Sequence, residues 1–356
     1  GVMTLDPKVV RGNLTKIIKK TPSAEQWNAI EAPLEPGLIV AGAGTGKTTV
    51  MAARIAWLIM TGQMSPDRIL CLTFTTKATG ELQSRVRSYL PAAIKFAQEA
   101  GFHSADEMGE PTILTYNAFG SRLLKEHALR LGLEPGARVV VDATRYQLGM
   151  RVVCNTALDL SAYGFTSVDA VSDLMKLDDQ LANYLIEPDT LIASDQRTIE
   201  MLDAVEKPQT ITEAMRSTSA KRIALAQLVK DFRDAKISAD IIDYSDQIRL
   251  SAKAALSSTS MQQLLKEQFG VVLLDEYQDT GIGQKVLLQA LFGNGHPVTA
   301  VGDPCQAIYG WRGAEITNMD MFPGDFPISV EPFEPAKQFN LTGNRRSGEN
   351  ILAAAN

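Results

Sequence analysis

The sequence has few residues of the kinds that build disulfide frameworks or zinc sites. Its 356 residues include three cysteines and three histidines. The cysteines, Cys71, Cys154 and Cys305, lie far apart, and none belongs to a Cys-x-x-Cys pair. A disulfide scaffold and a zinc centre therefore both lack the residues they require. Each cysteine is expected to be a small core residue.

Long apolar runs are also missing. No stretch approaches the roughly 18 consecutive apolar residues of a membrane span. The segment from Leu5 to Lys20 is polar and contains lysines, so it has no apolar signal-peptide core. These two absences predict a cytoplasmic protein with no membrane partner.

The chain also lacks an excess of positive charge. The chain has 35 Lys and Arg residues against 41 Asp and Glu, for a formal net charge of −6. This balance argues against a basic coat over the whole surface, by which some proteins bind nucleic acid. It leaves a local basic groove possible.

Short apolar runs alternate with helical periodicity along the first part of the chain. Strand-like runs at residues 38–40, 69–74 and 113–116 are each followed by apolar residues at helical spacing. Strand-like runs return at residues 271–274, 297–301 and 338–341. The alternation predicts an α/β fold, a doubly wound parallel sheet flanked by helices.

The pattern changes at about Asp142. From there to residue 265 the periodicity is mainly helical and β-branched runs are few, which predicts an inserted helical subdomain. Residues 322–335 are dense in proline and acid and are expected to form a surface crossing or linker. The chain stops inside a helical pattern at residues 349–355, so we interpret it as a fragment.

The stretch from Leu38 to Thr49 carries the strongest chemical signal. An apolar run enters a loop with three glycines in five positions and then a helix, so backbone N–H groups and the helix dipole can converge on phosphate oxygens. Lys47 is expected to reach the β- and γ-phosphates of ATP, and Thr48 to offer its hydroxyl to Mg²⁺. Ala41 stands where the usual P-loop pattern has glycine. The predicted nucleotide-binding residues of this loop are Ala43, Gly44, Thr45, Gly46, Lys47, Thr48 and Thr49.

The alternative for this stretch is a glycine-rich turn with a solvated lysine. The apolar residues before and after the loop favour the P-loop. A second signal strengthens that interpretation, because the apolar run 271–274 ends in Asp275 and Glu276. Ligands of open α/β sheets bind at the carboxyl ends of the strands. Asp275 is expected to hold Mg²⁺ through water, and Glu276 to orient and deprotonate the attacking water, which favours hydrolysis over simple binding.

A third strand-then-loop pattern covers residues 301–306. It brings Gln306 to the same predicted sheet edge, where its amide could sense the γ-phosphate. Tyr309, Trp311 and Arg312 follow closely, and this aromatic and cationic cluster suits stacking on unpaired bases. A core tryptophan and tyrosine beside an exposed arginine would explain the same residue types.

Taken in order, these motifs resemble those of the UvrD/Rep/PcrA-type superfamily 1A DNA helicases. Residues 275–280, Asp-Glu-Tyr-Gln-Asp-Thr, agree in full with the family's second motif. Gln26 matches the family's adenine-reading glutamine. Residues 73–78 are similar to a segment that lines the family's single-strand track, which implies DNA contacts for Phe74, Thr75 and Lys77.

Three segments depart from the family pattern or match it loosely. Asn117 stands where the family usually has histidine in a further DNA-contacting motif. Residues 344–347 read Asn-Arg-Arg-Ser where the family commonly has Asn-Tyr-Arg-Ser. Arg346 thus takes the place of the arginine that stabilises γ-phosphate charge, and Arg345 replaces a tyrosine that stacks near the base, a role open to a guanidinium plane. Residues 243–246 resemble the segment that ends the family's helical insert.

The resemblance implies a RecA-like motor fold in four parts: residues 1–141 and 266–335 as the first motor domain, 142–265 as its helical insert, and 336–356 as the start of a second motor domain. The implied function is an ATP- and Mg²⁺-dependent DNA helicase in repair, acting on single-stranded DNA and on junctions of single- and double-stranded DNA. The alternatives are a translocase or motor subunit of a helicase–nuclease complex, and a nucleotide-dependent switch without unwinding. Stimulation of the ATPase by single-stranded DNA would separate the switch from the motors.

Overall fold

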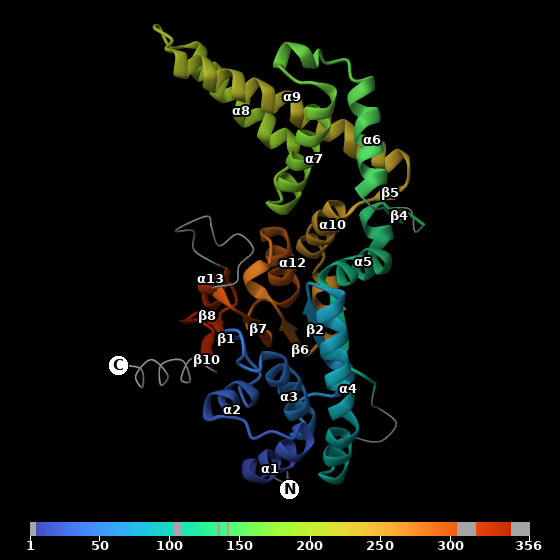
Figure 1. Cartoon of the computed structure of the whole chain (residues 1–356), viewed down its shortest axis with the longest axis vertical. Coiled ribbons are helices and arrows are strands. Elements are labelled where there is room, and N and C mark those ends of the chain that lie inside the picture. Colours follow the sequence, from blue (N-terminus) through green and yellow to red (C-terminus); the bar gives the residue numbers. More distant parts are fainter. Residues whose placement is uncertain (1–4, 103–108, 134–135, 141, 305–317, 343–356) are drawn as a thin grey trace, which may run out of the picture. The chain divides into compact units, whose positions relative to one another are not determined.

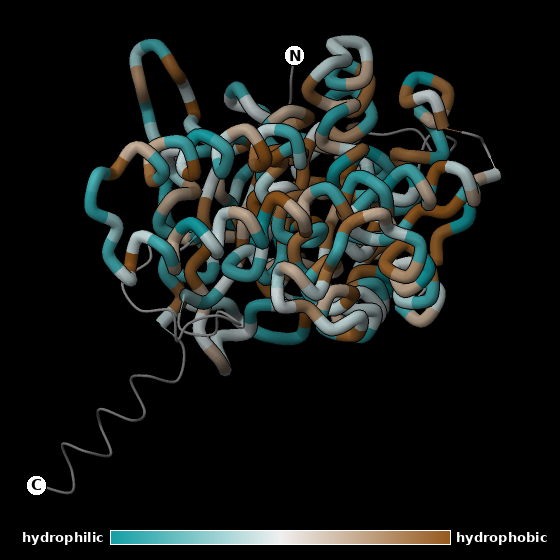
Figure 2. Tube along the Cα trace, turned by 90° about the horizontal axis from the view of Figure 1, so that it is seen from above, coloured by the Kyte–Doolittle hydropathy of each residue, from teal (hydrophilic) through white to brown (hydrophobic). Residues whose placement is uncertain are grey.

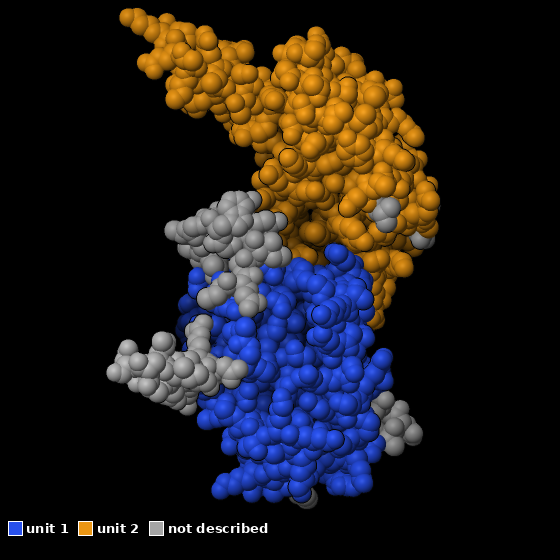
Figure 3. Space-filling model, viewed as in Figure 1, with its two compact units in different colours: residues 1–119, 258–280, 288–356 blue, residues 120–257, 281–287 orange. Residues whose placement is uncertain are grey.

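A computed structural model describes residues 5–102, 109–133, 136–140, 142–304 and 318–342. Its internal contacts divide the chain into two compact units, shown in different colours in Figure 3. Unit 1 contains residues 1–119, 258–280 and 288–356, and unit 2 contains residues 120–257 and 281–287. Both units are therefore discontinuous in sequence.

Unit 1 is built on a six-stranded sheet in which every pairing is parallel (Figure 1). The strands follow the order β10-β1-β7-β6-β2-β3 across the sheet. Their bounds are β1 (Gly37–Ala41), β2 (Ile69–Thr73), β3 (Thr112–Thr115), β6 (Val271–Leu274), β7 (Val298–Gly302) and β10 (Lys337–Leu341). The predicted parallel α/β fold is confirmed, with each strand close to the run that predicted it.

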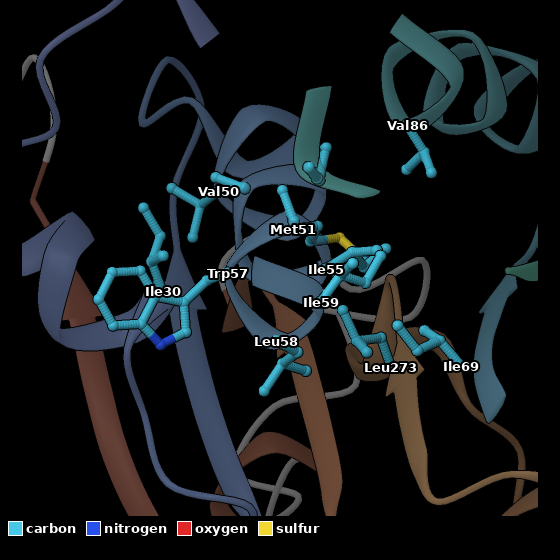
Figure 4. Packing of buried hydrophobic residues seen from close by; sticks show 14 of the residues in the cluster. Ile30, Val50, Met51, Ile55, Trp57, Leu58, Ile59, Ile69, Val86 and Leu273 are labelled. Carbon is cyan, nitrogen blue, oxygen red and sulfur yellow. The ribbon is translucent and has the colours of Figure 1, made fainter. Parts of the chain in front are cut away.

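One face of this sheet is covered by the first four helices. They are α1 (Pro7–Ile18), α2 (Ala24–Ile30), α3 (Lys47–Met60) and α4 (Thr76–Glu99). Every residue of α3 from Val50 to Met60 is buried, as expected for a helix enclosed by other elements. Figure 4 shows side chains of α3, including Ile55 and Ile59, near Ile69 and Leu273 of the sheet. Cys71 lies in the same core, as predicted.

The remaining elements of unit 1 either precede β2 or follow the insert. They are the short turns η1 (Pro66–Arg68) and η5 (Tyr277–Asp279), α11 (Thr259–Gln268), the end of α12 (Ile282–Phe292), α13 (Asn318–Asp325), and the hairpin of β8 (Ser329–Val330) with β9 (Phe333–Glu334). Residues 322–335 were expected to be a linker, but their first part is helical. Phe322 is fully buried in α13 and contacts Tyr277 with a ring-centroid distance of 5.1 Å, so burial outweighs the proline signal.

Unit 2 is mainly helical, as predicted for the insert. Its elements are most of α5 (Tyr116–His127), η3 (Ala128–Leu131), β4 (Arg138–Val139), α6 (Asp142–Asn155), η4 (Leu160–Tyr163), α7 (Ser167–Asn183), α8 (Pro188–Asp203), α9 (Thr210–Ser238), β5 (Ile241–Ile242) and α10 (Tyr244–Ser257). Leu174 of α7 and Phe232 of α9 are fully buried in its core. Cys154 is exposed, contrary to the prediction, because the neighbouring Val153 takes the buried position on α6.

The unit boundaries differ in three places from the expected domain limits. Residues 120–141 belong to unit 2 by their contacts, although the insert was expected to begin at 142. Helix α11 belongs to unit 1, where Met261 and Leu265 are buried. Strand β10 pairs with β1 over its whole length, so residues 337–341 belong to the six-stranded sheet of unit 1, whereas a second motor domain was expected to begin at residue 336.

Unit 2 also contains a buried ion cluster where α6, α7, α9 and α10 meet. The ammonium of Lys236 lies 3.0 Å from Asp243 Oδ2 and 2.9 Å from Asp246 Oδ2. Burial alone would raise the pKa of Asp243, but Lys236 and Arg145 outweigh it and bring that pKa to about 2. The cluster comprises Arg145, Asp178, Asp179, Arg233, Lys236, Asp243, Asp246 and Arg249. The sequence segment 243–246 thus anchors the end of the insert.

Hydrophobic stretches along the chain are short and are interrupted by hydrophilic residues (Figure 2). Within the described residues, no helix combines the length and apolar character needed to cross a membrane.

Candidate nucleotide-binding site

The predicted phosphate loop connects β1 to α3. Gly44 and Gly46 have φ angles of 75° and 74°, in the left-handed region that glycine adopts without strain. Gly46 is the N-cap of α3 and supplies no side-chain cap, so the N–H groups of the first turn, from Lys47 to Thr49, remain available to an anion. Thr45 differs from its neighbours, because its hydroxyl donates to Gly42 O at 2.7 Å and closes the loop.

Lys47 lies against both predicted carboxylates. Its ammonium is 2.9 Å from Asp275 Oδ1 and also pairs with Glu276 Oε1. Burial alone would lower the pKa of Lys47, but the two carboxylates outweigh it and raise that pKa. The structure therefore brings together three residues from two distant parts of the chain, with the lysine in its charged form.

Asp275 is nearly buried at the end of β6. Its N–H donates to Leu72 O at 2.9 Å, and the hydroxyl of Tyr116 donates to its carbonyl at 3.2 Å, so its backbone is fixed from two sides. Burial raises the pKa of Asp275, and Lys47 opposes that rise. The sequence analysis assigned no role to Tyr116.

The residues present suit Mg²⁺ better than a cation held entirely by protein. The described residues contain no group of three or more His, Cys, Asp and Glu that could hold a metal. Mg²⁺ is usually bound by one or two carboxylates, substrate phosphates and water. Asp275, together with Thr48 in the first turn of α3, fits that donor set.

Glu276 has an unusual backbone conformation for its type. Its φ and ψ are 51° and 40°, the left-handed region that side chains larger than glycine seldom adopt. Burial would raise the pKa of its carboxyl, but the bond to Lys47, with a smaller contribution from Gln278, lowers it. Glu276 is therefore ionised and able to accept a proton.

Gln26 approaches the P-loop from α2. Its Oε1 accepts the N–H of Ser23 at 2.9 Å in a capping box, and its Nε2 donates to Thr45 O at 3.1 Å. Gln26 is thus placed beside the phosphate loop, while its predicted contact with adenine stays a prediction.

A cleft of about 700 Å³ adjoins the first turn of α3. Thr48 and Thr49 line one part of it, and Arg85 and Tyr89 of α4 line another. The guanidinium of Arg85 donates to the hydroxyl of Thr49. The sequence analysis gave α4 no role beyond residue 78, although helical spacing places residues 81, 85 and 88 on one face.

The described candidates for DNA contact lie at the carboxyl ends of β2 and β3. These strands pair side by side, with Thr73 opposite Thr115. Lys77 and Asn117 are exposed in the first turns of the helices that follow. Phe74 packs on Tyr116 with ring centroids 4.4 Å apart. The hydroxyl of Thr75 accepts the N–H of Ala78 at 3.0 Å, so this side chain caps α4.

Six predicted site residues lie outside the described residues. They are Gln306, Tyr309, Trp311, Arg312, Arg345 and Arg346. Their assignments stay predictions.

A parallel sheet whose first strand enters a phosphate loop, with two carboxylates delivered beside the loop lysine, defines a P-loop domain of the RecA-like class. Residues 23–327 match the family described as UvrD/REP helicase N-terminal domain, and the chain belongs to that family. The resemblance seen in the motifs is thereby confirmed.

Several relatives match 93% of this chain. The ATP-dependent DNA helicase PcrA of Leuconostoc citreum is 27% identical over 333 residues, which cover 38% of that protein. DNA helicase II of Escherichia coli K12 is 27% identical over 332 residues, 39% of its length. The ATP-dependent DNA helicase UvrD1 of Mycobacterium leprae is 29% identical over 345 residues, 38% of its length. The chain thus spans about two fifths of the relatives it matches.

Proposed function

We propose that this chain is the nucleotide-binding motor portion of an ATP-dependent DNA helicase, which moves on single-stranded DNA and separates duplex. The observation that carries the proposal is the contact of Lys47 with Asp275 and Glu276 beside the phosphate loop. The three relatives named above are all DNA helicases, which supports the choice of DNA as the track.

In this proposal, ATP phosphates compete with the two carboxylates for Lys47. As the ammonium turns to the phosphates, Asp275 loses its counter-charge and becomes available with Thr48 to hold Mg²⁺. Bound Mg²⁺ would withdraw charge from the phosphate oxygens. Glu276 is released at the same moment and can orient and deprotonate water. The N–H groups of the loop and of the first turn of α3 hold the phosphates, and Gln26 reads the base.

Single-stranded DNA would cross the ends of β2 and β3. Phe74, Lys77 and Asn117 offer a ring, a charge and an amide there, and the hydroxyl of Thr75 is already engaged in capping α4. Few phosphate contacts are expected, in keeping with the net charge of −6. Junctions of single- and double-stranded DNA, the cytoplasm and a role in repair belong to the same proposal, as does a second motor domain, whose start was expected at residue 336.

The test is the ATPase activity of the intact protein with and without single-stranded DNA, together with a strand-separation assay. We expect DNA to stimulate hydrolysis, and Lys47→Ala to abolish both activities. Hydrolysis that ignores DNA would favour a nucleotide-dependent switch. Stimulated hydrolysis without strand separation would favour a translocase or a motor subunit of a helicase–nuclease complex.

A further inference from the structure

Gln278 lies two residues after Glu276 in the turn η5, and its side chain connects two strand ends. Its Nε2 donates to Glu276 Oε2 at 2.6 Å, and its Oε1 accepts the N–H of Asp303 at 3.1 Å. Glu276 follows β6 and Asp303 follows β7, the neighbouring strand of the sheet. The residue is buried, with 6% of its surface exposed. One amide thus ties the predicted base to the end of the next strand.

The chemistry of its two partners fixes the orientation of this amide. An ionised carboxylate can only accept hydrogen bonds, and a backbone N–H can only donate one. The amide nitrogen must therefore face Glu276 and the oxygen must face Asp303. The backbone of Gln278 is held as well, since its carbonyl accepts from Asn318 Nδ2 at 3.3 Å.

The close approach of Gln278 depends on the last residue of β7. A Cβ atom added to Gly302 would lie 2.3 Å from Gln278 Oε1 and 3.3 Å from Gln278 N. Any other residue at position 302 would push the side chain of Gln278 away. Gly302 is therefore needed at this position by the amide that supports Glu276.

The carboxylate of Glu276 has two side-chain partners among the described residues, Lys47 on Oε1 and Gln278 on Oε2. In the proposed function the ammonium of Lys47 turns from Glu276 to the ATP phosphates. Gln278 is then the side chain that keeps the carboxylate in place during hydrolysis.

We infer that Gln278 is a positioning residue, which holds Glu276 in the orientation required for hydrolysis while Lys47 is engaged with phosphate. The inference rests on the proposed role of Glu276 as the base. A base that is held in the required orientation accelerates hydrolysis more than a mobile one, because transition-state stabilisation depends on geometry that is set in advance.

The experiment compares Gln278→Ala and Gln278→Glu in the full-length protein, with single-stranded DNA and saturating Mg·ATP. Loss of a hydrogen bond to a charged group predicts that Gln278→Ala lowers kcat on the order of 10- to 100-fold. KM for ATP should stay within about twofold, because the phosphate loop is untouched. Gln289→Ala is the matched control, since the side-chain amide of Gln289 also bonds to a backbone group, donating to Asp325 O at 3.1 Å, but has no bond to the site residues.

The split between kcat and KM supplies a readout that a merely structural role would not move, because a general loss of structure would also weaken nucleotide binding. Gln278→Glu keeps the shape of the side chain but replaces the donor that faces Glu276 by a carboxylate, which cannot donate, so it should lower kcat with little change in KM. Should Gln278→Ala fail to fold, this variant carries the test alone.

Glu276→Gln separates failure of the inference from failure of the proposed function. If Glu276→Gln hydrolyses ATP normally, the proposed base is wrong. If Glu276→Gln is inactive while both Gln278 variants keep the wild-type kcat, the inference is overturned. In support of it, adding Gln278→Ala to Glu276→Gln should cause little further loss, because two residues that act as one unit are not additive.

Discussion

Replacement of Arg54 by methionine should destabilise unit 1 strongly. Arg54 lies in the middle of α3 with 1% of its surface exposed. Its guanidinium donates to the carbonyls of Ala29, Ile30 and Ala32 at 3.4, 3.2 and 2.7 Å, to that of Pro33 at 3.2 Å, and to the Thr299 hydroxyl at 3.3 Å. The residue thus joins the end of α2 to α3 and β7.

The expected loss can be worked from these contacts. At about 1.5 kcal/mol each, the lower value for hydrogen bonds to a charged group, the five bonds amount to about 7 kcal/mol. Burial lowers the pKa of Arg54 from its ordinary value to about 10. That shift corresponds to a desolvation penalty of roughly 3 kcal/mol, which methionine does not incur. The net loss should be about 4 kcal/mol, or on the order of 10 °C in Tm.

The assay is urea-induced and thermal unfolding of the whole chain. Arg68→Met is the matched control, since the Arg68 guanidinium donates to one carbonyl, that of Glu267, at an exposed position, and it should cost about 1 kcal/mol or less. Arg54→Lys should fall between wild type and Arg54→Met, because an ammonium keeps the charge but cannot span several carbonyls. Wild-type stability in Arg54→Met would refute the reasoning, since it would mean that the carbonyls of residues 29–33 do not depend on the guanidinium.

Four further predictions concern the nucleotide site, the ion cluster of unit 2 and the binding of DNA. Lys47→Ala should remove most affinity for Mg·ATP whereas Glu276→Gln should retain binding and lose hydrolysis, so equal loss of nucleotide binding would contradict the assigned roles. The pKa of Asp243 is 3.8 in the unfolded chain and about 2 in the folded chain. Its carboxylate should therefore contribute about 2 kcal/mol to the free energy of unfolding above pH 4, and this contribution should be lost as the pH falls toward 2. The stability difference between wild type and Asp243→Asn should shrink over that range, and a constant difference would disprove the linkage. Trp311→Ala should cost about 1–3 kcal/mol of single-strand affinity without unfolding, and a collapse in Tm with unchanged DNA affinity would assign Trp311 to the core. The slope of log affinity against log salt should be far shallower than roughly −10, the value for a repressor with many phosphate contacts, as measured by titration from low to high salt.

The parts of the fold and site that the sequence predicted were those encoded by local patterns. Apolar runs located the six strands, and the glycine spacing before Lys47 located the phosphate loop. The convergence of Lys47 with Asp275 followed from a general rule, that parallel strands present their carboxyl ends at one edge.

The features that sequence reasoning missed depend on contacts between distant residues. Helix periodicity places Arg85 on a face of α4, but nothing in the pattern shows that Thr49 lies opposite. Gln278 belongs to the motif at residues 275–280, yet its proposed role depends on Gly302 and Asp303, which are close to it in space but distant in the sequence. The residues of strand β10 were assigned to the start of a second motor domain, because pairing with β1 produces no recognisable sequence pattern in either strand.

The pairing of β1 has a consequence for synthesis on the ribosome. This strand, which leads into the phosphate loop, lies between β7 and β10, and its residues 37–41 pair with residues 299–302 and 337–341. At about 5–20 residues per second, the nascent strand waits on the order of tens of seconds before both neighbours have been translated. Until then its apolar residues and backbone hydrogen-bonding groups are exposed on both edges, as in any unpaired strand. The nucleotide site can therefore be completed only after β10 has been translated, and the newly made β1 segment is available to chaperones in the interval.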